Sequence, residues 1–327
     1  MFKNFQHRLA ISPTSLHTVV FIMLVAWIAA SKQSPTETTE GLWNLLPHII
    51  IGGGLVNTVL AFVCASAAVY ILGELNISQI LLRVNSRAIS FTFAALITAA
   101  TFTHCMQPGM ILMLCMLLSY FTLFSAYQIE DSATLVYVSF LYLGIGILIY
   151  PQTVWLVPVY WLSVYILRAI NSRSICASVL GLITPLWVVG SIAYCTDRIH
   201  LFAQLFSQMV DFGWAGYRTL TASQILMFVL SFTLFLISFA DFYTRWGLDK
   251  TRTRILLSIV GIHGMFVYLA ILLHPAHLNT LMPVAFIPTA IMGGHYVAND
   301  ATPISNIITW ILTVTIITCF ILSSWIL

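Results

Sequence analysis

The chain alternates long apolar runs with short polar segments, and this pattern predicts a bundle of membrane-crossing helices. A helix needs about 20 apolar residues to cross a bilayer core roughly 30 Å thick. Backbone groups must also be satisfied inside each segment, which favours helices over open sheet. The predicted spans are residues 16–30, 47–72, 88–103, 109–127, 133–149, 152–168, 176–195, 222–240, 254–273, 279–294 and 304–326.

The region 133–168 is predicted to be a tight helical hairpin rather than one helix. The 36 residues from Ser132 to Leu167 carry no charge, and as a single helix they would be about 54 Å long. The tetrapeptide "YPQT" at 150–153 interrupts the run, because proline ends a helix and its neighbours tolerate water.

The polar segment 196–221 contains a further helix of a different kind. In "DRIHLFAQLFSQMVDF", residues 197–212, apolar side chains recur at helical spacing with polar residues between them. The pattern indicates an amphipathic helix lying in the outer interface. It would serve either as a lid over the bundle or as a guide for a lipid-borne substrate.

Composition supports the same class. Hydrophobic residues make up 60% of the chain and charged residues 7%, whereas a soluble domain has about 25% charged residues. The runs are too long for the alternating strands of an outer-membrane barrel. The net charge of +3 is spread over short loops and makes no patch suited to nucleic acid. The sequence therefore predicts an all-α integral membrane bundle of about eleven spans, plus one interfacial helix, in a single domain over 1–327.

The distribution of Lys and Arg predicts the orientation. With the N-terminus in the cytoplasm, ten of these residues fall in inner segments and three in outer segments, as the positive-inside rule requires. The C-terminus then lies outside. We expect an uncleaved first helix, since no clean signal-peptidase site follows the first apolar run.

The predicted outer segments contain a wider range of polar residues than the inner segments do, so we expect a functional site there. Two acids there are candidate general bases, with solvated loop acids as the alternative. Histidine, glutamine and arginine side chains are candidates for binding a substrate headgroup, with hydrated turns and an interface anchor as alternatives. The candidate acids are Glu40 and Glu37, and the candidate binding residues are His104, Gln107, Gln152, Arg198, His200, His274 and His277. We expect His274 or His277 to share one outward cavity with Glu40 or His104.

No metal or other cofactor is predicted. His274 and His277 are three residues apart, but no third ligand is fixed by spacing. The six cysteines lack CxxC spacing. Cys105 and Cys195 are the two placed at the outer face, where an oxidising exterior permits a disulfide if they are close enough.

Two polar residues are expected inside the membrane. His263 lies about nine residues into its span and Asn57 follows a run of three glycines. An ionisable group at this depth is a functional candidate, and a histidine bonded to a neighbouring helix is the alternative. Pro283 and Pro288 lie in one short span, which indicates either a broken helix of the kind that lines transporter cavities or kinked packing.

Three segments carry a resemblance to known proteins. "VSFLYLGIGILIYPQTVWLVPVYWLSVYILRAI", "SVLGLITPLWVV" and "HLNTLMPVAFIPTAIMGGHYV" resemble an uncharacterised family of bacterial polytopic membrane proteins, which implies the bacterial plasma (inner) membrane. The hairpin "LGIGILIYPQTVWLVPVYWL" also resembles one in the GT-C-class glycosyltransferases that use polyprenyl-phosphate sugars. That likeness implies a catalytic acid in the first outer loop, which holds Glu37 and Glu40. The usual Asp-Glu or Asp-Asp pair is absent here and the loop is short.

The leading functional hypothesis is an enzyme that acts on a lipid-linked substrate at the outer face. Its expected partners are membrane lipids and a polyprenyl-phosphate-linked sugar. Glu40, or else Glu37, would activate an acceptor hydroxyl, while Arg198 or the outer histidines would neutralise the carrier phosphate. One alternative is a small-molecule or lipid transporter, motivated by the two prolines and His263. The other is a non-catalytic membrane scaffold.

Overall fold

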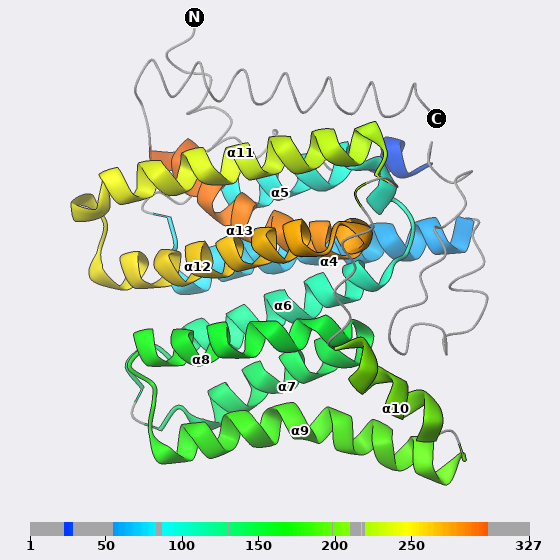
Figure 1. Cartoon of the computed structure of the whole chain (residues 1–327). Helices are drawn as coiled ribbons and strands as arrows, with labels where there is room; N and C mark the ends of the chain where they lie inside the picture. Colours follow the sequence, from blue (N-terminus) through cyan, green and yellow to red (C-terminus); the bar gives the residue numbers. More distant parts are fainter. Residues whose placement is uncertain are drawn as a thin grey trace, which may run out of the picture.

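The computed structural model describes residues 23–28, 55–82, 87–129, 131–197, 199–209, 217 and 220–299. Throughout these ranges every regular element is a helix (Figure 1). This confirms the predicted all-α class. The α-helices after the short helical piece 23–28 are α4 (Leu55–Gln79), α5 (Ala88–Ala99), α6 (Pro108–Ser125), α7 (Ala133–Ile149), α8 (Val157–Ile166), α9 (Ser172–Cys195), α10 (Ile199–Gln208), α11 (Ala222–Thr244), α12 (Thr251–Leu273) and α13 (Leu278–Asn299). The short 3-10 helices are η3 (Thr101–Thr103), η4 (Pro151–Leu156), η6 (Trp246–Leu248) and η7 (Pro275–His277).

Six of these helices are long and apolar enough to cross a membrane. They are α4, α6, α9, α11, α12 and α13. By contrast α5, α7 and α8 are shorter, with 12, 17 and 10 residues. The predicted span 304–326 lies outside the described residues. The count of eleven spans therefore stays a prediction.

The hairpin predicted around "YPQT" is present. The bounds of α7 coincide with the predicted span 133–149, and the next span consists of η4 followed by α8. The interfacial helix predicted over 197–212 corresponds to α10, which is shorter.

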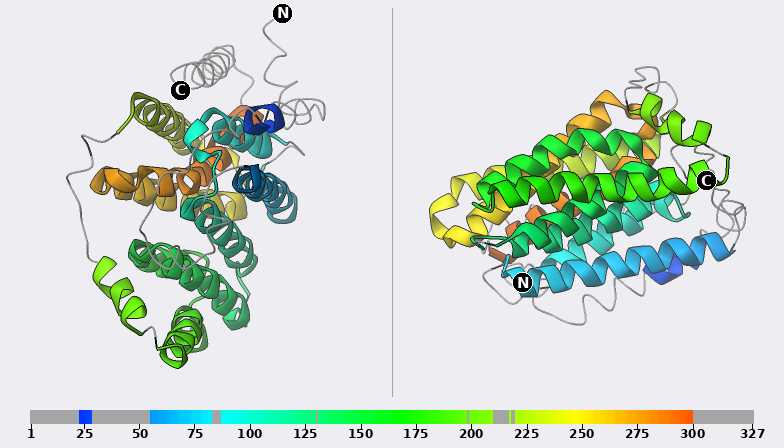
Figure 2. Two further views of the ribbon diagram at one scale, coloured as in Figure 1. Left: turned by 90° about the vertical axis from the view of Figure 1, so that its right-hand side faces the viewer. Right: turned by 90° about the horizontal axis from the view of Figure 1, so that it is seen from below.

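The helix α13 lies at the centre of the bundle. It packs against α5, α6, α11 and α12, and its residues from 280 to 296 are buried. Pro283 and Pro288 lie inside it, yet it continues through both. Figure 2 shows α7, α8 and α9 stacked on one side of the helices that surround α13.

Basic residues gather at one end of the bundle. This end holds the turns α4–α5, α6–α7, α8–α9 and α11–α12 (Figure 1). The other end holds the turns α5–α6, α7–α8, α9–α10 and α12–α13. Every Lys and Arg among the described residues lies in or beside a turn of the first end. These residues are Arg87, Arg168, Arg173, Arg245, Lys250, Arg252 and Arg254. We call this the basic end and the other the opposite end. Which end faces the cytoplasm stays a prediction from the positive-inside rule.

Small residues let α7 and α9 approach closely. A Cβ at Gly181 of α9 would lie 2.5 Å from the carbonyl oxygen of Tyr137 on α7. A Cβ at Gly144 of α7 would lie 2.7 Å from the ring of Pro185 on α9. Lipid tails are as apolar as leucine, so helices associate in a membrane by close packing and hydrogen bonds. Glycine permits that packing here.

We therefore expect Gly181→Ala to destabilise the protein. The added methyl group would push against backbone, which cannot move away as a side-chain tip can, and overpacking of this kind costs about 1–3 kcal/mol. The measurement is the thermal unfolding midpoint in detergent. Gly247→Ala is the control, because nothing lies within 4 Å of its Cβ position. Equal midpoints for the two variants would contradict the close approach of α7 and α9.

Candidate functional site: a side cavity at the opposite end

A cavity of about 260 Å³ lies between the α7–α8 hairpin and the α12–α13 pair. Its walls are mostly apolar side chains of η4, α12 and α13, with Leu112 of α6. Trp155 and Leu269 line it and are also 45% and 50% exposed on the outside of the bundle. The cavity is therefore open at the side, towards the place of the lipid, and we call it the side cavity. Its lining residues are Leu112, Tyr150, Gln152, Thr153, Trp155, Leu156, Phe266, Val267, Leu269, Ala270, Leu273, His274, Leu281 and Val284.

Polar groups line the side cavity where the two helical turns meet. Gln152 and Thr153 come from η4, and His274 comes from the C-terminus of α12. The Gln152 Oε1 and Thr153 Oγ1 atoms are buried and have no hydrogen-bond partner within the described ranges. Most buried polar atoms in proteins have a partner, so an exception needs an explanation. A bound molecule with a polar head would supply these missing hydrogen bonds.

The connection from α9 to α11 contacts the rim of the side cavity at two points. The Trp155 indole N–H donates a hydrogen bond to the Met209 carbonyl, just after α10, with 3.0 Å between the heavy atoms. The Tyr217 hydroxyl donates to the Leu272 carbonyl near the end of α12. The amphipathic helix α10 is thus held beside the cavity entrance. This position agrees with either role expected for it, a lid or a guide.

His277 lies next to the side cavity without lining it. Its ring is 5.6 Å from the Tyr150 ring and 5.9 Å from the His274 ring, measured between centroids. His274 is 3% exposed and His277 is half-buried. The structure thus brings together three sequence candidates, namely Gln152, His274 and His277. Sequence analysis did not single out Thr153 or Trp155, although both follow Pro151 in the hairpin turn.

His104 and Gln107 occupy a buried turn between α5 and α6, away from the residues of the side cavity. His104 is 1% exposed, and its Nε2 donates to the Thr98 carbonyl at 3.1 Å. Its ring centre lies 4.0 Å from that of Trp27, with the two rings tilted by 33°. Gln107 is 2% exposed and its Nε2 donates to the Phe102 carbonyl. One nitrogen of each side chain thus holds the turn together, while the His104 Nδ1 and Gln107 Oε1 atoms have no hydrogen-bond partner within the described ranges.

Burial lowers the pKa of His104 to about 4, because the charged ring would lose its hydration. The hydrogen bond to Thr98 opposes only part of this change. His104 is therefore neutral at pH 7 and adds no positive charge there.

This lowered pKa predicts a pH dependence of stability. The unfolded chain takes up a proton on His104 near pH 6.5, whereas the folded protein does so only near pH 4. The free energy of unfolding should then fall as the pH drops from about 6.5 towards 4, by at most about 1.4 kcal/mol per pH unit. Thermal midpoints at pH 7 and pH 5 should differ less in His104→Gln than in the wild type. The same difference in both proteins would contradict burial of a neutral ring.

Of the remaining candidates in the predicted outer segments, only His200 lies among the described residues. Glu37, Glu40 and Arg198 lie outside the described residues. His200 lies in α10 and is exposed. The presence of an acid in the side cavity therefore stays a prediction.

His263, the deep histidine, joins three helices. Its Nδ1 is 2.9 Å from the Tyr120 hydroxyl of α6, and its Nε2 is 2.8 Å from the Ser163 hydroxyl of α8. Ser163 also donates to the Val159 carbonyl at 2.8 Å. Every hydrogen finds an acceptor if Tyr120 donates to Nδ1 and Nε2–H donates to Ser163. The chain of donors then ends on a backbone carbonyl, which suits a structural contact better than proton relay.

We accordingly expect His263→Phe to lower stability by about 1–3 kcal/mol, because Tyr120 and Ser163 would lose a partner inside the membrane. The thermal midpoint in detergent measures this. His263→Gln, which keeps a donor and an acceptor, should recover part of the loss. A His263→Phe midpoint at or above the wild-type value would contradict the structural role.

Asn57 and the two cysteines predicted at the outer face lie among the described residues. The Asn57 side chain accepts a hydrogen bond from the Met106 backbone N–H at 2.5 Å, which ties α4 to the turn between α5 and α6. Cys105 is buried, Cys195 is exposed, and no disulfide joins them. No group of three or more metal-ligating side chains occurs in the described ranges.

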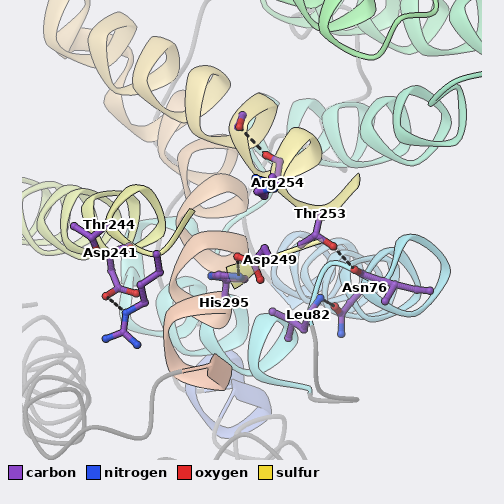
Figure 3. Close-up of polar contacts among 11 residues, drawn as sticks. Asn76, Leu82, Asp241, Thr244, Asp249, Thr253, Arg254 and His295 are labelled. Carbon is purple, nitrogen blue, oxygen red and sulfur yellow. Dashed lines mark hydrogen bonds and ion pairs between the residues drawn. The ribbon is translucent and has the colours of Figure 1, made fainter. Parts of the chain in front are cut away.

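A buried contact between an aspartate and a histidine at the basic end was not predicted from the sequence. The Nε2 atom of His295 on α13 lies 3.2 Å from the Asp249 carboxylate, in the loop before α12 (Figure 3). Both side chains are at most 5% exposed. They are 46 residues apart in the sequence, and each looked like an ordinary residue at the edge of a span.

The apolar helical architecture is that of a multi-pass membrane protein. No known family matches the sequence, and no curated protein or solved structure is significantly similar to it. The likeness to uncharacterised bacterial membrane proteins and to GT-C-class enzymes stays a prediction from sequence.

Proposed function

We propose that this protein binds a lipid-borne substrate in the side cavity, with the polar head of the lipid beside Gln152 and Thr153. The observation that carries the proposal is the pairing of apolar walls with two buried polar atoms that have no partner within the described ranges. A void of roughly 150 Å³ already accommodates benzene. A cavity of about 260 Å³ has room for part of a hydrocarbon chain.

The side opening supports a lipid rather than a water-soluble ligand. A ligand arriving from water would enter through an end of the bundle, whereas Trp155 and Leu269 open the cavity on the flank. The polar residues Gln152 and His274 lie at the opposite end, far from the basic residues. If the basic end is cytoplasmic, the lipid head belongs to the outer leaflet.

Within this proposal, the substrate is a lipid-linked sugar on a polyprenyl phosphate. Its single chain suits a narrow apolar cavity, and the hairpin of η4 resembles one in GT-C-class enzymes. Glycosyl transfer would need a carboxylate near the head, for which Glu40 and then Glu37 are the candidates. Arg198 would pair with the carrier phosphate.

The transporter and scaffold alternatives gain no specific support. Both nitrogens of His263 have protein partners, and α13 continues through Pro283 and Pro288 as a packed helix. A scaffold role leaves the unpartnered atoms of Gln152 and Thr153 unexplained.

The proposal is tested by photo-crosslinking purified protein with a photoreactive polyprenyl phosphate. The wild type should be labelled on residues of η4, α12 or α13 that line the side cavity. Ala270→Trp should lower labelling by at least about tenfold, because the indole fills the cavity and repacking cannot make room without strain. Ala240→Trp is the matched control, since Ala240 is exposed on α11, and it should be labelled as the wild type is.

A second pair of variants tests the polar end of the side cavity. Gln152→Leu and Thr153→Val should each weaken labelling by about fivefold, the effect of one lost hydrogen bond. Labelling elsewhere on the protein, or equal labelling by photoreactive phosphatidylcholine, would overturn the proposed substrate.

A further inference from the structure

The loop between α11 and α12 at the basic end combines positive charge with exposed aromatic and apolar side chains. The segment "DFYTRWGLDKTRTR", residues 241–254, holds four basic and two acidic residues. Tyr243, Trp246 and Leu248 are 50%, 36% and 65% exposed. Because the loop joins two membrane-length helices, these side chains lie where the acyl chains meet the headgroups. Tyr and Trp are enriched at that depth.

Both acids of this segment already have a partner side chain within the protein. Asp241 binds Arg245 at 3.0 Å, and Asp249 binds His295 at 3.2 Å. Within the described ranges neither Lys250 nor Arg254 forms an ion pair. The segment therefore presents cations that have no paired counter-charge among the described residues.

At these positions the two cations do not stabilise α12. Lys250 is its N-cap, and Arg254 lies in the next turn. The helix dipole makes cations unfavourable near an N-terminus. An anion bound beside Lys250 and Arg254 would remove this repulsion.

Contacts within the protein hold the loop in one arrangement. The buried Asp249–His295 pair fixes the loop to α13, and the Thr253 hydroxyl donates to the Ile80 carbonyl at 3.2 Å (Figure 3). The Arg254 guanidinium lies 5.8 Å from the centre of the Trp246 ring, and Trp246 stacks on Tyr243 at 5.6 Å. A topology signal needs only positive charge, whereas this geometry places the charge over an exposed aromatic pair.

We propose that this loop binds the headgroup of an anionic phospholipid. Lys250 and Arg254 contact the phosphate, and Trp246 and Leu248 lie against the upper acyl chains. An acidic protein partner would match the charge as well, but the exposed apolar side chains at membrane depth favour a lipid. The inference is independent of the side cavity, which lies at the opposite end.

Native mass spectrometry in detergent doped with phosphatidylglycerol or phosphatidylcholine tests the proposal. The wild type should bind phosphatidylglycerol more tightly. Each cation in direct contact with the phosphate should contribute about a fivefold change in affinity, so Lys250→Gln with Arg254→Gln should lower that affinity by about 25-fold. Arg168→Gln with Arg173→Gln is the matched control, because it removes the same charge from exposed positions of the same end and should leave the affinity unchanged.

Several outcomes would overturn the assignment. Equal losses in both double variants would mean a general attraction to the basic end. No preference for phosphatidylglycerol would remove the site, and tighter binding of a soluble acidic peptide would make it a protein-docking surface. If the first double variant fails to fold, the wild type still tests the idea, since its binding of phosphatidylglycerol must weaken as salt is added. Ala270→Trp should keep this binding, which separates the result from that for the side cavity.

Discussion

Every polar group that the bundle carries into the bilayer must find its partner inside the protein, and much of the structure follows from this constraint. Many hydroxyls satisfy it locally, as Thr98 and Thr289 do by donating to the carbonyl one turn earlier. Others join helices. Ser119 of α6 bonds Ser139 of α7, and Tyr268 of α12 bonds Thr289 of α13. Together with the contacts of His263, these bonds set which helices are neighbours. Ser66 and Ser238 also have buried hydroxyls without a partner in the described ranges, but Gln152 and Thr153 differ from them because they line the side cavity.

Close packing accounts for the rest of the architecture. Lipid solvates apolar side chains as well as a protein interior does, so helices need a precise fit to remain associated. Gly181 supplies it between α7 and α9. Gly109 supplies it between α6 and α13, where a Cβ would collide with the Thr280 backbone. Glycines at helix contacts thus act here through the space they leave, and their conformational freedom is not used.

The sequence predicts helices better than it predicts contacts. The bounds of α7 and the break at "YPQT" follow from local chemistry, namely an apolar run and a proline. The burial of His104 does not, because it depends on Trp27, Thr98 and the approach of α6 to α13. The pairing of Asp249 with His295 likewise depends on where two distant segments meet. For the candidate site, the sequence offers only short polar turns between predicted helices. They could not show that Gln152 and His274 share a cavity while His104 is enclosed elsewhere.

The attachment of α13 at both ends bears on how a lipid would reach the side cavity. Near its start, Gln224 of α11 donates to Asn279 at 2.7 Å, and Gly109 lies against Thr280. Near its other end, His295 is paired with Asp249. Leu281 and Val284 therefore form a wall of the cavity that is fixed by the centre of the bundle. The opposite rim is attached more lightly, by the Trp155 hydrogen bond to Met209 and the Tyr217 hydrogen bond to Leu272. Because opening that rim breaks far fewer contacts than moving α13, entry from the membrane beside α10 is the route that the packing favours.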